Sequence, residues 1–156
     1  MRQKLSEEAE VSSNMIGILV VTHGQMAEGM LDSLDMVMGS MEAVDFVSLN
    51  RGEDYEIFEK NMENKIKTLQ QGDGVLILAD LFGASPFNAA QKVAKKLEAE
   101  GIQSKIISGA NLAMLLEACS NRMMSNLEEV FEAVKASGKE SIAEPVMVAE
   151  EGDDDY

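Results

Sequence analysis

The sequence predicts an α/β fold, a doubly wound three-layer sandwich around a mainly parallel sheet of strand order 2-1-3-4. Four apolar runs rich in β-branched residues alternate with segments of helical spacing, which is typical of a parallel sheet covered by helices on both faces. The first and third runs, 15–22 and 75–80, are almost continuously apolar, as expected of central strands. The chain has 156 residues, of which 46% are hydrophobic, and this indicates one domain with one sizeable core.

The elements follow in chain order. Strands are predicted at 15–22, 43–49, 75–80 and 102–108. Helices are predicted at 25–38, 53–71, 86–100, 111–119 and 126–137, because apolar residues recur there three and four positions apart. Glycine follows the second and third of these helices and indicates their C-terminal ends. A fifth strand is expected at 146–148.

The two ends of the chain are predicted to lie outside the domain, which covers 15–148. Residues 1–14 are charged and aperiodic, so we expect a flexible N-terminal extension. Residues 149–156 are expected to form an acidic disordered tail, because five of the last seven residues are acids.

Composition and charge narrow the classes of function. The formal net charge of −15 argues against nucleic acid and anionic membranes as partners. Cys119 is the single cysteine, so there is no disulfide framework and a reducing compartment is expected. No apolar run is long enough to span a bilayer, and the N-terminus lacks the apolar region of a signal peptide. We therefore expect a cytoplasmic protein.

Two polar residues end the first and third predicted strands and define the candidate site. His23, the only histidine, follows the first strand, and Asp80 ends the third. The carboxyl ends of parallel strands meet at one edge of the sheet, and in the order 2-1-3-4 the strand order reverses between strands 1 and 3. Ligands bind at such a switch point, so we expect these two side chains to lie together there.

These residue types indicate a nucleophilic histidine. A neutral imidazole attacks through its unprotonated nitrogen. A carboxylate at Asp80 that accepts the Nδ1–H of His23 would fix the tautomer and leave Nε2 free. The same carboxylate would stabilise the positive charge that develops on the ring. The pair could therefore carry a phosphoryl group.

The segment after Asp80 is predicted to bind the oxygens of that group. Ser85 suits a helix N-cap and Pro86 suits the first helical position, so free N–H groups there would form an anion site. Gly83 permits close backbone approach, and Gly24 opens the helix after His23 in a similar way. The sequence has no nucleotide-binding motif and no cluster of metal ligands. We therefore expect a site that works without a cofactor or a metal.

Structural interpretations of single residues stand beside the functional one. A lone histidine at a strand end is more often structural, and Asp80 alone could merely cap the following turn. Asn88 and Asn111 are interpreted as hydrogen bonders at helix starts or in loops. Arg51 is interpreted as an exposed surface residue and Cys119 as a core residue.

At these residues the chain resembles the IIA component of the mannose-type (mannose/fructose/sorbose) sugar phosphotransferase system. The matching motifs are IGILVVTHG, ILADLFGASPFNAA and SGANLAMLLEA, and the resemblance covers roughly residues 15–140. It implies that His23 accepts a phosphoryl group on Nε2 from the phosphocarrier protein HPr. The group then passes to a IIB component, which phosphorylates sugar entering through membrane components IIC and IID. Asp80 becomes the orienting partner, and Ser85 lies close to the phosphoryl group.

Two departures from the family pattern stand out. Ala84 occupies a position where many relatives have a second glycine, a mild change in the phosphoryl-binding loop. Some relatives continue into a IIB domain, whereas this sequence ends after its acidic tail, so a free-standing IIA is expected. The sequence does not identify the sugar or the IIB partner.

The resemblance also implies a homodimer in which the last strand is exchanged between subunits. The segment after Gly138 is too short to form a sheet of its own, and its apolar residues Ile142, Val146 and Met147 would be costly to expose. Pro145 is tolerated on an edge strand. Exchange of an identical element is a low-cost route to a two-fold dimer. Residues 139–148 are therefore expected to add, antiparallel, to the partner's sheet.

Two other functional classes remain open. A receiver-like signalling domain would be phosphorylated on Asp80, although Thr22 and His23 stand where such a domain needs an acidic pair. A regulatory module of the same fold would sense phosphorylation without feeding sugar transport. A receiver-like domain would carry an acyl phosphate, which is labile to acid and to base, whereas a phosphohistidine is labile to acid and stable to base. Failure of the phosphorylated protein to pass its group to any IIB component would indicate the regulatory module.

Overall fold

The computed structural model describes residues 14–147, and within them it has the predicted sheet. The strands are β1 (Gly17–His23), β2 (Val44–Leu49), β3 (Val75–Ala79) and β4 (Ser104–Ile107). All neighbouring pairs are parallel in the order β2-β1-β3-β4, so the predicted order is confirmed. The helices are α1 (Met26–Met38), α2 (Tyr55–Leu69), α3 (Ser85–Glu98), α4 (Leu112–Asn121) and α5 (Leu127–Glu140).

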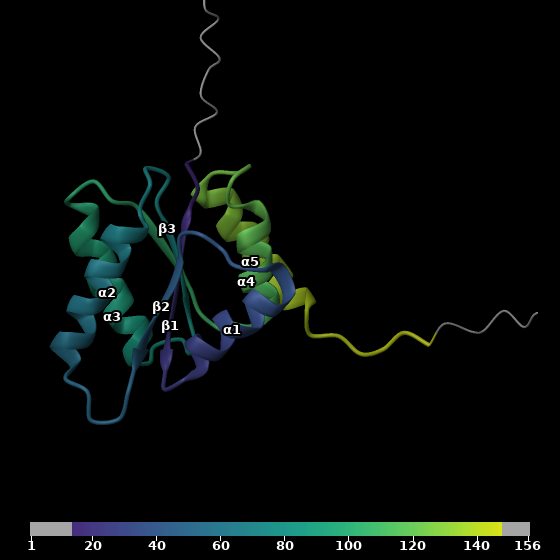
Figure 1. Ribbon diagram of the computed structural model, residues 1–156, viewed down its shortest axis with the longest axis horizontal. Coiled ribbons are helices and arrows are strands. Elements are labelled where there is room, and N and C mark those ends of the chain that lie inside the picture. Colours follow the sequence, from purple (N-terminus) through teal and green to yellow (C-terminus); the bar gives the residue numbers. More distant parts are fainter. Residues whose placement is uncertain (1–13, 148–156) are drawn as a thin grey trace, which may run out of the picture.

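The helices cover both faces of the sheet and make three layers (Figure 1). Helices α2 and α3 pack on one face, and α1, α4 and α5 pack on the other. Strand β1 contributes to both cores: Ile18 and Val20 face the α1 side, and Leu19 and Val21 face the α2 side. All four side chains are fully buried. A strand with two buried faces needs a continuous apolar run, which is why the sequence shows no alternation here.

The ends of several elements differ from their predicted positions. Strand β4 is shorter than the predicted strand at 102–108, and α4 and α5 continue past their predicted ends. Asn111 and Asn126 precede these two helices as N-caps. Their side-chain oxygens accept hydrogen bonds from the backbone N–H groups of Met114 (3.0 Å) and Glu129 (2.9 Å). The predicted role of Asn111 at a helix start is therefore confirmed.

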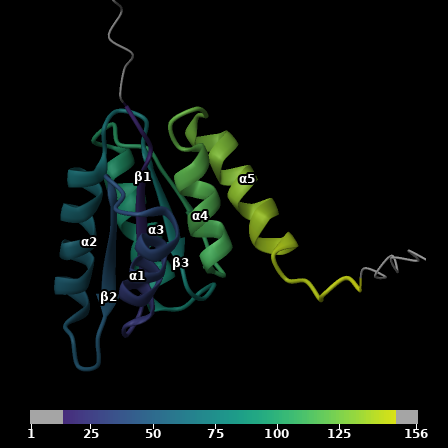
Figure 2. The ribbon, with the colours of Figure 1, turned by 45° about the vertical axis from the view of Figure 1, so that its right-hand side comes forward.

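The segment after α5 forms no strand in the single chain. Residues 142–147 have no regular secondary structure and run away from the body of the domain (Figure 2). The predicted strand at 146–148 is thus wrong for residues 146 and 147 of an isolated chain, and Val148 lies outside the described residues. A strand needs an edge to pair with, and in the single chain residues 142–147 pair with none of the four strands. Residues 1–13 of the predicted extension and the predicted tail at 149–156 also lie outside the described residues.

A network of charges joins α2 to α3, and Glu63 is at its centre. The nearly enclosed Glu63 carboxylate lies 3.0 Å from Lys96 Nζ, 3.1 Å from Lys67 Nζ and 3.8 Å from Lys60 Nζ. Hydrogen bonds from Lys96 and then Lys67 lower the pKa of Glu63 from 4.5 to about 2. Because this pKa is depressed, the stabilisation is present at neutral pH and is lost as the pH falls from about 4.5 towards 2.

Candidate functional site

His23 is the last residue of β1 and stands at the carboxyl edge of the sheet. Its side chain is 48% exposed, although the strand that carries it is buried. Gly24 then reverses the chain with a φ of +55°, a conformation that favours glycine, and its N–H donates to the Leu49 carbonyl at 2.9 Å. The imidazole is therefore held by a rigid strand but remains open to a reactant.

The residue before His23 fixes the helix that follows. Thr22 is fully buried, and its Oγ1 accepts a hydrogen bond from the N–H of Ala27 in the first turn of α1 at 2.9 Å. Gln25, the N-cap residue of α1, makes no side-chain cap hydrogen bond, so Thr22 supplies one. Sequence reasoning did not assign this role to Thr22. A hydroxyl residue at the end of an apolar strand was the signal available.

Asp80 directly follows β3 and binds His23 twice. Its Oδ2 lies 2.6 Å from His23 Nδ1 and accepts the backbone N–H of His23 at 2.8 Å. Its Oδ1 accepts the N–H of Leu81 at 2.8 Å. Burial opposes ionisation of this carboxyl, but the hydrogen bonds from His23 and Leu81 outweigh burial, so the pKa of Asp80 lies below its usual range. The structure thus brings together the two residues that the sequence placed at one sheet edge.

This geometry defines the tautomer of the imidazole. An ionised carboxylate only accepts hydrogen bonds, so the Nδ1 of His23 carries the proton that it donates to Asp80. In the neutral ring Nε2 is then the nitrogen without a proton, and it has no hydrogen-bond partner within residues 14–147. An unprotonated, accessible imidazole nitrogen beside an orienting carboxylate is a nucleophile.

The loop after Asp80 brings the start of α3 to the same edge. Gly83 has a φ of +75°, and its carbonyl accepts a hydrogen bond from Asn88 Nδ2 at 2.9 Å. Asn88 is thus a loop hydrogen bonder, as the sequence indicated. The predicted N-cap at Ser85 is wrong: Ala84 has an extended backbone (φ −82°, ψ 172°) and is the N-cap, so the helix begins at Ser85 itself.

The first turn of α3 carries free backbone donors. The N–H groups of Ser85 and Phe87 have no acceptor in the described part of the chain, and Pro86 between them has no N–H. Such groups at a helix N-terminus favour an anion. The predicted anion site of free N–H groups therefore remains available, although the side chain of Ser85 does not cap the helix.

Exposed apolar side chains border the site. Phe82 is 81% exposed and its ring lies 4.9 Å from that of Phe87, between ring centroids. Leu81, which follows Asp80, and Met26, two residues after Gly24, are also exposed. Large apolar side chains around a reactive group are typical of a surface where another protein docks.

The remaining sequence candidates have structural positions. Arg51 is exposed in the turn after β2, and Cys119 is buried in the core of the α1 side, where burial raises the pKa of its thiol. Both agree with the structural interpretations given above. In the described chain, no helix has the length and apolarity needed to cross a membrane. Residues 14–147 also contain no group of three or more His, Cys, Asp or Glu side chains placed to bind a metal ion.

The fold and the site together define a class, the doubly wound α/β proteins with a carboxylate-oriented histidine at the switch point of a parallel sheet. Comparison with known proteins gives the family. The family model described as "PTS system fructose IIA component" matches residues 17–135. The chain belongs to this family, the mannose-type IIA components of the sugar phosphotransferase system.

Individual relatives agree with this assignment. The mannose-specific EIIAB component of Escherichia coli K12 is 31% identical over 139 residues, which cover 86% of this chain and 42% of that protein. The fructose-specific EIIA component of Bacillus subtilis is 28% identical over 127 residues, which cover 81% of this chain and 84% of that protein. The crystal structure of an EIIA component from Streptococcus agalactiae has a TM-score of 0.73 at 30% identity, covering 83% of this chain and 97% of that one.

Proposed function

We propose that this protein is a cytoplasmic IIA phosphocarrier that accepts a phosphoryl group from phospho-HPr on His23 and passes it to a IIB component. The observation that supports this most strongly is the 2.6 Å contact between His23 Nδ1 and Asp80 Oδ2, which leaves Nε2 free on a side chain that is 48% exposed. Family membership supports the same role. The membrane components IIC and IID would be served indirectly, through the IIB component.

The proposed transfer is an in-line exchange between two imidazoles. The Nε2 lone pair of His23 attacks the phosphorus, a P–N bond to Nε2 forms, and the P–N bond to the HPr histidine breaks. The ring of His23 becomes positively charged while Nδ1 keeps its proton, and the ionised Asp80 stabilises that charge. The free N–H groups of Ser85 and Phe87 would bind the phosphoryl oxygens, with Gly24 and Gly83 allowing close approach. No cofactor enters this mechanism.

The test is labelling of the wild-type protein with phosphoenolpyruvate, enzyme I and HPr. We expect one phosphoryl group per chain, in a bond that is labile to acid and stable to base, followed by transfer to a IIB component. A bond labile to both acid and base would indicate an acyl phosphate on Asp80 and contradict the proposal. Stable charging without transfer to any IIB component would indicate the regulatory alternative.

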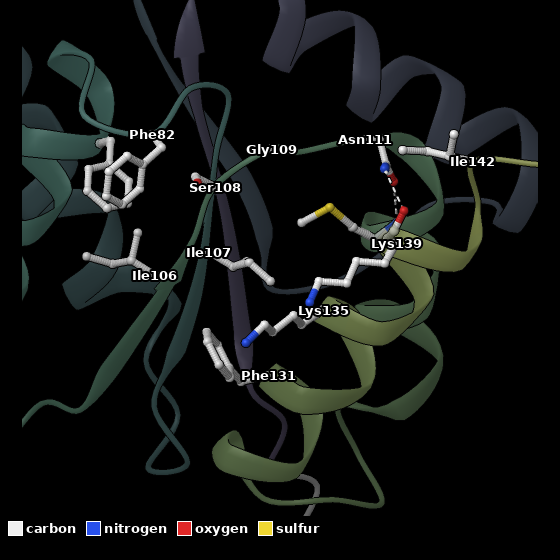
Figure 3. Close-up of a pocket in the computed structure, with 13 residues that line it drawn as sticks. Phe82, Ile106, Ile107, Ser108, Gly109, Asn111, Phe131, Lys135, Lys139 and Ile142 are labelled. Atoms are coloured by element: carbon white, nitrogen blue, oxygen red, sulfur yellow. Dashed lines mark hydrogen bonds between the residues drawn. The ribbon is translucent and has the colours of Figure 1, made fainter.

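We also propose that the protein is a homodimer in which the segment after α5 adds to the partner's sheet. The outer edge of β4 has no neighbouring strand in the described chain. A groove of about 430 Å³ lies beside this edge, and its lining includes Phe82, Ile106 and Ile107 of β4, and Phe131 of α5 (Figure 3). The side chains of Ile142, Val146 and Met147 are largely exposed in the single chain. The apolar segment of one subunit could therefore pair with the free β4 edge of the other and bury its side chains in the groove beside that edge.

Truncation after Gly138 is expected to convert the dimer into a monomer. It removes the segment that would pair with the partner's β4 but leaves the sheet and its cores intact. Sedimentation at several concentrations, with the full chain beside it, measures the change. A truncated protein as tightly dimeric as the full chain would exclude exchange as the main contact. A full-length protein that is monomeric at micromolar concentration would exclude the dimer.

A further inference from the structure

A column of polar contacts joins α2 to α3 along their length. The four α2 residues that form it are spaced four positions apart and therefore lie on one face of the helix. The contacts are Lys67 with Glu100 in the turn just after α3 (3.4 Å), Glu63 with Lys96 (3.0 Å), Glu59 with Lys92 (2.8 Å) and the Tyr55 hydroxyl with the Ser85 carbonyl (3.4 Å). The column begins far from His23 and ends at the first residue of α3.

The charged contacts restrict how α3 can slide along α2. A shift of one helix along the other would disturb the two ion pairs between them and the third to Glu100, just after α3. The central one is the most enclosed, because the side chain of Glu63 is 7% exposed and also binds Lys67 and Lys60. These contacts therefore favour one position of α3 along α2.

The last contact of the column connects α2 to the proposed phosphoryl-binding turn. Tyr55 is the first residue of α2, and Asp54 caps that helix by accepting the N–H groups of Glu56 (2.8 Å) and Ile57 (3.2 Å). The Tyr55 hydroxyl donates to the carbonyl of Ser85, whose own N–H is one of the two free donors. Burial and the nearby Glu59 raise the pKa of Tyr55, while Lys92 lowers it. The hydroxyl therefore stays protonated and remains a donor.

We infer that Tyr55 is a positioning residue of phosphoryl transfer, which holds the first turn of α3 so that its free N–H groups meet the phosphoryl oxygens. This inference rests on the function proposed above. Donors that are already aimed at developing charge need no reorganisation during the reaction. The Ser85 carbonyl belongs to the peptide that leads to Pro86, so a restraint on that carbonyl also restrains the turn that carries both donors.

The test compares Tyr55→Phe with Tyr156→Phe, which removes the hydroxyl of the only other tyrosine in the chain. We expect Tyr55→Phe to lower the maximal transfer rate from phospho-HPr by about two- to tenfold, the range for one hydrogen bond. The KM for phospho-HPr and the midpoint of thermal unfolding should stay close to those of the wild type. The amide resonances of Ser85 and Phe87 should shift in the unphosphorylated protein. Tyr156→Phe should change none of these quantities.

Two outcomes would overturn the inference. One is a wild-type maximal rate in Tyr55→Phe, and the other is a raised KM with an unchanged rate, which would make Tyr55 a docking residue. If phospho-HPr fails to charge even the wild-type protein, the proposed function is wrong. The amide resonances of Ser85 and Phe87 still decide the positioning role in that case, because they require no transfer, and unshifted resonances would refute it.

Discussion

Replacement of His23 by alanine is expected to abolish phosphorylation by phospho-HPr. The chain contains no second histidine, so no other imidazole can replace the nucleophile. The loss should be complete and should not be a partial reduction, because a carrier without its acceptor nitrogen has no alternative bond to form. Stoichiometric labelling with radioactive phosphoenolpyruvate, HPr and enzyme I measures it directly.

The fold should survive this change. The imidazole is half-exposed, and the Asp80 carboxylate keeps the backbone N–H of residue 23 and the N–H of Leu81 as partners after the ring is removed. A far-ultraviolet circular dichroism spectrum and a thermal midpoint close to those of the wild type serve as the control. Labelling of the His23→Ala protein at the wild-type level would place the acceptor elsewhere in the chain and end the proposal.

The second large effect is expected from Asp80→Asn. The side-chain amide can donate to Nδ1 of His23, and this favours the tautomer in which Nε2 carries the proton and cannot attack. The amide also lacks the charge that stabilises the phosphorylated ring. We expect transfer to slow by about a hundredfold or more, because the corresponding change in serine proteases acts through the same wrong tautomer. Single-turnover transfer from phospho-HPr measures this rate.

Asp45→Asn is the matched control for that variant. Asp45 is on β2 and also holds a short ion pair, to Lys65 at 2.6 Å, and it accepts the N–H of Phe46 at 2.8 Å. Its loss should lower stability without slowing transfer, because it lies away from the carboxyl edge of the sheet. Wild-type transfer rates in a correctly folded Asp80→Asn protein would show that the two side chains of the site are not coupled.

The sheet and the two residues at its edge could be predicted from the order of the amino acids. Continuous apolar runs at β1 and β3 identify strands buried on both faces, and such strands occupy the centre of a doubly wound sheet. The residue that ends each run then stands at the same edge, because parallel strands share their direction. The proximity of His23 and Asp80 therefore follows from the hydrophobic pattern of the sequence and the common direction of the strands. The structure adds the distance of 2.6 Å between His23 Nδ1 and Asp80 Oδ2.

The contacts that support the site could not be predicted in this way, because they depend on how the chain packs in three dimensions. The contact of Tyr55 with Ser85 and that of Glu63 with Lys96 join residues that no periodicity relates to one another. Their distances depend on how helices pack against the sheet and against each other. The residue at which α3 begins likewise depends on the backbone conformation of the preceding loop. Propensity favours serine as a cap, but the extended conformation of Ala84 places Ser85 inside the helix, because the turn from Asp80 through Gly83 fixes where the chain enters it.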